Sequence, residues 1–155
     1  MNSQPHLSHP LILLIDEVIR LNGRLKSVFA GVNAASGLPA MELTVLTAVV
    51  AAQAPPTVAQ IGRSLGHPRQ VIQRAARALL AAGLIAAAPN PHHKRAALLL
   101  ATSSGKRLKR ATDRRALKAA NNFLHHIDGA RCERLVVDIR KLRGQIELQV
   151  RELEA

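Results

Sequence analysis

The sequence is almost without aromatic residues. Its 155 residues include two Phe and neither Trp nor Tyr, although 48% are hydrophobic. A core without large rings must be built from aliphatic side chains, and Ala and Leu dominate here. A chain of this length can enclose one real core. The composition therefore predicts one mainly helical domain.

Cysteine and long apolar runs are also scarce. Cys132 is the only cysteine, which excludes a disulfide framework and a cysteine-based metal cluster. The N-terminal apolar run Leu11 to Ile15 ends at Asp16, so it is far too short for a signal peptide or a membrane-spanning helix. No arrangement of nucleophile, base and orienting group is evident. We expect a cytoplasmic protein that is not an enzyme, needs no cofactor and does not enter a membrane.

Acidic residues are missing from the middle of the chain, where Glu42 is the only one between Lys26 and Asp113. The net charge is +12, and the segment from Gln60 to Arg115 carries twelve basic residues against one acidic residue. Such clusters displace counterions from nucleic acid. A membrane surface would instead require large apolar residues beside the cations, and the basic segment offers mostly alanine. The charge distribution therefore predicts a nucleic acid as a partner, and the helix-turn-helix described next indicates double-stranded DNA.

Local signals divide the segment from Thr57 to Ala101 into two helices and a hairpin. Thr57 and Gln60 have the spacing of a capping box, so a helix begins there. Gly66 favours the left-handed backbone that ends a helix. Pro68 suits the first position of a second helix, which we expect to end before Gly83. This order predicts a helix-turn-helix.

The second helix has one polar face and one apolar face. At about 100° per residue, Ile72, Ala75 and Leu79 share one side, and a cationic, amide-rich arc of roughly 140° lies opposite. The N-terminal part of a recognition helix reaches base edges first. We therefore expect base contacts from Arg69, Gln70, Gln73 and Arg74, and phosphate contacts from Arg63, Ser64, Arg77 and the basic residues after Gly105. For the basic residues beyond Lys106, a solvated helix face is the open alternative.

Two short apolar runs follow, at residues 84–88 and 96–101, separated by the polar loop PNPHHKR. Two prolines and Asn90 favour a turn between them. Alanine is a weak strand former, so the hairpin is predicted from its context. In a winged helix this hairpin is the wing, and we assign His92, Lys94 and Arg95 to its DNA contact.

Long helices are predicted on both sides of this core. Apolar residues recur at helical spacing near residues 11–30, 39–52 and 130–152, and a helix with a basic first half is expected over 104–126. The terminal helices carry more apolar surface than a small winged helix covers, which favours a symmetric dimer. The predicted organisation is a single domain, 1–155, with a winged helix-turn-helix core at 39–101 and dimerisation helices at 10–30 and 104–153. The expected interface comprises Leu11, Leu14, Ile15, Leu135, Ile139, Leu142 and Ile146.

The order of these elements resembles the multiple-antibiotic-resistance regulator (MarR) family of bacterial transcription factors over nearly the whole chain. Three stretches carry the resemblance: GLPAMELTVLTAVV, TVAQIGRSLG with the following helix ending in AAGLI, and NPHHKRAALLLATSSGKRL. The family's wing resembles D-x-R-D-x-R, followed by a strand and L-T-x-x-G. Here Asn90, His92 and His93 stand at the first three of those positions, and Arg95 keeps the last. The resemblance implies a homodimer on a pseudo-palindromic operator, acting as a repressor and released by a small-molecule effector or by oxidation.

Two alternatives remain open at this stage. The pair His125 and His126, or the lone Cys132, could serve a metal- or thiol-sensing regulator, although neighbouring histidines on a helix point about 100° apart. Solvated histidines and a small interface cysteine are the simpler interpretation. The second alternative is an architectural protein that binds DNA without sequence preference.

Overall fold

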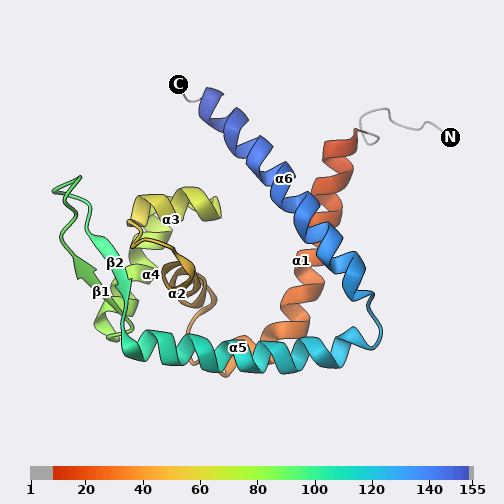
Figure 1. Ribbon diagram of the computed structural model, residues 1–155, viewed down its shortest axis with the longest axis horizontal. Helices are drawn as coiled ribbons and strands as arrows, with labels where there is room; N and C mark the ends of the chain where they lie inside the picture. The colour runs from red at the N-terminus through yellow and green to blue at the C-terminus, as the bar shows by residue number, and fades with distance from the viewer. Residues whose placement is uncertain (1–8, 154–155) are drawn as a thin grey trace. The chain divides into compact units, whose positions relative to one another are not determined.

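The computed structural model describes residues 9–153, which form six helices and one two-stranded sheet within that range (Figure 1). The mainly helical fold with a hairpin confirms the predicted winged helix-turn-helix class. The elements in chain order are α1 (Pro10–Ala34), α2 (Ala40–Ala51), α3 (Val58–Leu65), α4 (Arg69–Ala81), β1 (Ile85–Ala88), β2 (Leu98–Ala101), α5 (Ser103–Leu124) and α6 (Gly129–Leu153).

Contacts divide the chain into two compact units, Met1–Ala119 and Ala120–Ala155. The first unit holds the helix-turn-helix, the hairpin, α1 and most of α5. The second holds the end of α5 and α6. The core lies in the first unit, where α2, α4 and the hairpin meet. Its largest fully buried side chains are Val45, Leu46, Ile72 and Leu79.

The helix-turn-helix follows its sequence signals closely. The amide of Gln60 donates to Thr57 Oγ1 at 3.2 Å, and the Thr57 amide donates to Gln60 Oε1 at 2.8 Å, which confirms the capping box. Gly66 ends α3 with φ 66° and ψ 30°, the left-handed conformation that favours glycine. Pro68 was expected inside α4, but it is the residue before the helix, with ψ 140°. The helix therefore begins one residue later than predicted.

The hairpin pairs β1 with β2 in antiparallel register, Ile85 opposite Ala101 and Ala88 opposite Leu98. Both strands are shorter than the apolar runs. Ile85 and Leu99 are buried, whereas Ala86 and Ala87 are exposed. The Leu99 amide donates to the Pro56 carbonyl at 2.8 Å, so β2 is also bonded to the segment that leads into α3.

A close junction joins the end of α4 to the start of α5. The Thr102 hydroxyl donates to the Gly83 carbonyl at 2.7 Å and lies 3.0 Å from the Leu84 carbonyl. The same oxygen accepts from the Gly105 amide at 3.1 Å, so Thr102 caps the start of α5. A Cβ on Gly105 would stand 2.0 Å from the Leu84 carbonyl oxygen, so only glycine fits there. This junction orients α5 on the winged helix.

The end of α1 differs from the prediction. The helical pattern was expected to end near residue 30, but the helix continues to Ala34 despite the glycine at 31. The turn that ends it is fixed by Ser36, whose hydroxyl donates to the Asn33 carbonyl at 2.6 Å and accepts from the Leu38 amide at 3.1 Å. Arg115 of α5 also donates to the Ala35 carbonyl at 3.1 Å, a long-range bond that no local pattern reveals.

Candidate nucleic-acid interface

Helix α4 has one buried face and one exposed face, as its sequence predicts. Ile72, Ala75, Ala76 and Leu79 are buried in the core. The opposite face lines an open depression of about 390 Å³. Of its five lining residues, Gln73 is half-buried and the other four are exposed: Arg69, Gln70, Gln73, Arg74 and Arg77. The structure therefore brings the predicted base-reading side chains together on one accessible surface.

The guanidinium groups on this face are not paired with any carboxylate of the described chain. Within residues 9–153, none of Arg69, Arg74 and Arg77 forms an ion pair with a carboxylate. A charged face without acids attracts an anion, and Arg presents a planar fork that matches phosphate oxygens or guanine edges. The α4 face can therefore bind both the backbone and the bases of DNA.

The turn before α4 adds further polar groups. Arg63 and Ser64 are exposed in the last turn of α3, as expected for phosphate contacts. His67 was not singled out from the sequence, yet it is exposed directly before α4, with its amide donating to the Gly62 carbonyl at 2.9 Å. The sequence feature that could have indicated a role for His67 is its position between Gly66 and Pro68, inside the turn of the helix-turn-helix.

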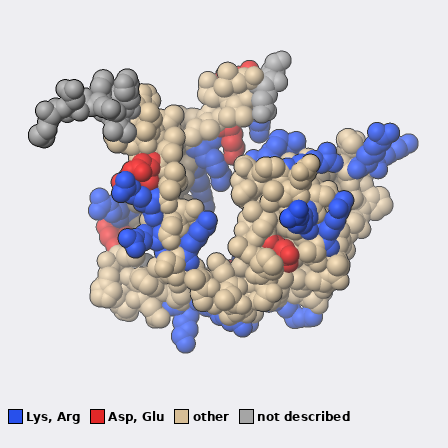
Figure 2. Space-filling view, turned by 180° about the vertical axis from the view of Figure 1, so that it is seen from behind, with Lys and Arg blue, Asp and Glu red and all other residues tan. Residues whose placement is uncertain are grey.

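The wing loop has a defined conformation. Asn90 Oδ1 accepts from the His92 amide at 3.0 Å, and the Asn90 carbonyl accepts from the His93 amide at 3.2 Å. Asn90 thus supplies the side-chain turn that an aspartate at this position would also make. His92, Lys94 and Arg95 are all exposed. Cations are prominent and acids few over the winged-helix side of the molecule (Figure 2).

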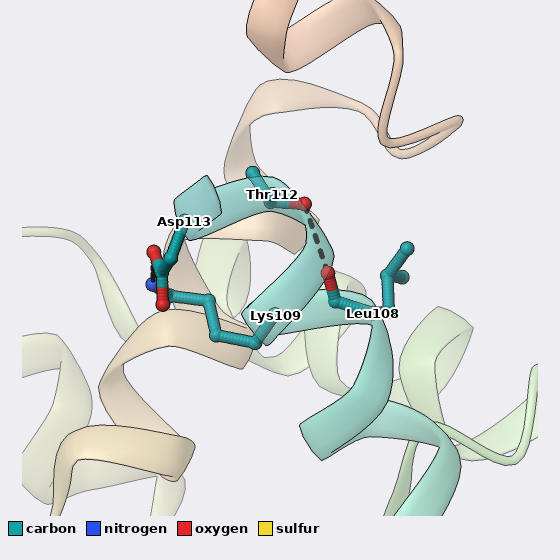
Figure 3. A network of polar contacts seen from close by, with 4 residues as sticks. All are labelled: Leu108, Lys109, Thr112 and Asp113. Atoms are coloured by element: carbon teal, nitrogen blue, oxygen red, sulfur yellow. Dashed lines mark hydrogen bonds and ion pairs between the residues drawn. The ribbon is translucent and has the colours of Figure 1, made fainter. Parts of the chain in front are cut away.

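Not every basic residue of α5 is free to bind an anion. Lys109 forms an ion pair with Asp113 one turn later, and its side chain is only 15% exposed (Figure 3). The neighbouring Thr112 donates its hydroxyl to the Leu108 carbonyl at 3.0 Å. The expectation that the basic residues after Gly105 hold phosphates therefore does not extend to Lys109, because its charge is already neutralised.

The residues of the sensing alternative are not assembled into a site. His125, His126 and Cys132 are exposed. In the described part of the chain, no group of three or more His, Cys, Asp or Glu side chains is placed to hold a metal ion. None of the helices between residues 9 and 153 combines the length and apolar character that a membrane span requires.

A capped helix-turn-helix, an acid-free second helix and a basic hairpin beside it define a winged-helix DNA-binding protein. Comparisons with known proteins agree with this class. Residues 36–96 match the family model described as MarR family. An uncharacterized protein of Mycobacterium bovis is 29% identical over 136 residues, covering 88% of this chain and 94% of that protein.

Solved structures show the same fold. A MarR-family transcriptional regulator from Rhodococcus sp. RHA1 superposes with a TM-score of 0.71 at 18% identity, covering 90% of this chain and 96% of that one. CouR from Rhodococcus jostii RHA1, solved bound to p-coumaroyl-CoA, gives a TM-score of 0.68 at 19% identity, with 93% and 96% covered. The winged-helix segment of this chain is therefore similar to the MarR family, and the whole fold is the one seen in MarR-family regulators.

Proposed function

We propose that the protein is a repressor that acts as a homodimer on a pseudo-palindromic operator. The observation that carries the proposal is the acid-free face of α4. This face is exposed, whereas the opposite, apolar face of the same helix is buried in the core. A dimer seated on an operator that overlaps a promoter blocks access to that promoter. Repression is therefore the simplest consequence of such binding.

Each part of the surface has a separate role in this proposal. Arg69, Gln70, Gln73 and Arg74 are nearest the N-terminal end of α4 and read base edges in the major groove. Arg77 and the end of α3 hold phosphates, and the wing places its cations on the adjacent backbone or in the minor groove. The phosphate-binding and wing residues are Arg63, Ser64, Arg77, His92, Lys94 and Arg95.

Dimerisation is supported by the exposure of the terminal helices. Neither α1 nor α6 has a buried residue, although both carry large aliphatic side chains. Among the assigned interface residues, Leu14 and Leu142 are half-buried and the others exposed: Leu11, Ile15, Leu135, Ile139 and Ile146. A two-fold axis through these helices sets two recognition helices about 34–36 Å apart, one turn of DNA.

A small-molecule effector completes the proposal. CouR, which has this fold, was solved with p-coumaroyl-CoA bound. A ligand that binds the DNA-free form of a dimer more tightly than the DNA-bound form lowers operator affinity by that difference. We therefore expect an organic effector to release this protein from its operator.

Selection from random DNA duplexes tests the function. A dimeric regulator enriches an inverted repeat whose half-sites are centred about 10–10.5 bp apart, or a multiple of that spacing. The direction of regulation is then measured with a reporter placed behind the selected sequence. Enrichment of no motif identifies an architectural protein instead, and a reporter that rises with the protein identifies an activator.

Arg74→Ala is expected to reduce the difference in binding affinity between operator DNA and random DNA. If Arg74 reads a guanine, its loss weakens operator binding by about 1–3 kcal/mol at that base pair, with a smaller effect on random sequence. Arg63→Ala is the matched control, because a phosphate contact weakens both sequences alike. Competition binding of each variant to the two duplexes measures the difference. Equal losses on both sequences for Arg74→Ala would reassign that residue to phosphate.

A further inference from the structure

Helix α5 carries a second cationic surface, separate from α4. At about 100° per residue, five exposed cations lie within an arc of roughly 120°. The opposite side of the helix holds Gly105 and Thr112, which are buried, and Leu108, which packs against the core. Cations project along the α5 edge at the bottom of Figure 2. We call this surface the α5 stripe; it comprises Lys106, Arg107, Arg110, Arg114 and Lys118.

The cations of the stripe are not paired with carboxylates of the described chain. Asp113, the one acidic residue in the α5 sequence, is already paired with Lys109. Within residues 9–153, no stripe cation forms an ion pair, and Arg107 donates only to the Ser104 hydroxyl, at 2.9 Å. Like charges spaced three and four residues apart destabilise a helix. Five of them on one face therefore destabilise the helix by a small amount, which a bound anion would offset.

The dimensions of the stripe fit a polyanion. From Lys106 to Lys118 the helix rises about 18 Å at 1.5 Å per residue. Each strand of duplex DNA carries a phosphate about every 3.4 Å, so this length corresponds to roughly five phosphates of one strand. A small anionic metabolite would meet only part of the stripe. The charge and the extended shape together favour a nucleic-acid backbone.

The position of the stripe excludes a role in base reading. The Thr102 hydroxyl donates to the Gly83 carbonyl, so α5 begins at the C-terminal end of α4, opposite the end that enters the groove. The stripe then continues away from that point toward Arg115, which holds the end of α1. We propose that the α5 stripe binds the sugar-phosphate backbone of DNA flanking the operator, without sequence preference; this rests on the proposed operator binding.

The test compares two lengths of duplex carrying the selected operator. One duplex ends at the outer edges of the half-sites, and the other extends about 21 bp, two helical turns, further on each side. The stripe variant replaces its five cations with Gln. The matched control replaces five cations of α6 with Gln: Arg131, Arg134, Arg140, Arg143 and Arg151. Affinity is measured against salt concentration for each protein on each duplex.

Wild-type protein and the α6 control are expected to bind the long duplex at least about 10-fold more tightly than the short one, with a steeper salt dependence. The stripe variant should lose this gain and bind the short duplex normally, and the slope of log affinity against log salt should fall by about 0.9 for each contact removed. A stripe variant that keeps the length gain, or a control that loses it equally, overturns the proposal. Failure of the proposed function looks different, because wild-type protein would then show no sequence preference on the short duplex.

Discussion

Gly105→Ala is expected to destabilise the winged helix by about 3 kcal/mol or more, because the new methyl group has no space and its nearest neighbour is backbone. The added Cβ would stand 2.0 Å from the Leu84 carbonyl oxygen and 3.2 Å from a methyl of Leu46. Relief requires α5 to move off the end of α4. That movement also breaks the bonds from Thr102 to the Gly83 and Leu84 carbonyls.

Urea unfolding followed by circular dichroism measures this effect, and Gly23→Ala is the matched control. Gly23 lies inside α1, and a Cβ there would meet nothing within 4 Å. Because glycine is unfavourable inside a helix, Gly23→Ala should stabilise by about 0.5–1 kcal/mol. A Gly105→Ala protein with the wild-type unfolding midpoint would show that α5 adapts to the methyl group without cost.

The parts of this protein that follow from its sequence are those set by neighbouring residues. The capping box joins Thr57 to Gln60, three residues later, and the end of α3 depends on the left-handed backbone of Gly66 itself. Both features are present as predicted. The two faces of α4 depend only on helical periodicity, so the residues lining its depression were predictable by name. The candidate DNA surface is formed mostly by residues close together in the sequence, so most of it could be predicted from the sequence.

Other features could not be predicted from the sequence. They depend on contacts between residues far apart in the chain, or on which of several possible partners a side chain contacts. The bond from Leu99 to the Pro56 carbonyl and the bond from Arg115 to the Ala35 carbonyl join segments far apart in the chain. Lys109 appeared equivalent to the other α5 cations, but it is paired with Asp113 and its side chain is only 15% exposed. The close approach at Gly105 likewise depends on the packing of α5 against α4, which no local motif specifies.

The second large effect concerns assembly. Ile139 is 48% exposed and Ile146 46% exposed on α6, while Ile15 is 52% exposed on α1. Covering a large aliphatic side chain contributes roughly 1.5–3 kcal/mol, so rows of them on both terminal helices provide enough energy for a stable dimer. An interface that loses one central side chain to a buried charge loses that contribution and adds the cost of desolvating a carboxylate.

We therefore expect Ile139→Asp to dissociate the dimer at micromolar concentration and to weaken operator binding by about 100-fold or more, because the second half-site is then no longer bound at high effective concentration. Binding to an isolated half-site should stay unchanged, since no DNA-facing residue is altered. Lys141→Asp is the matched control. Lys141 is two residues after Ile139, about 200° around the helix, so it lies on the charged face rather than the apolar face. Sedimentation gives the oligomeric state, and fluorescence anisotropy gives the affinity. A monomeric wild-type protein, or a monomeric Ile139→Asp protein with full operator affinity, would mean that the apolar faces of α1 and α6 serve another purpose.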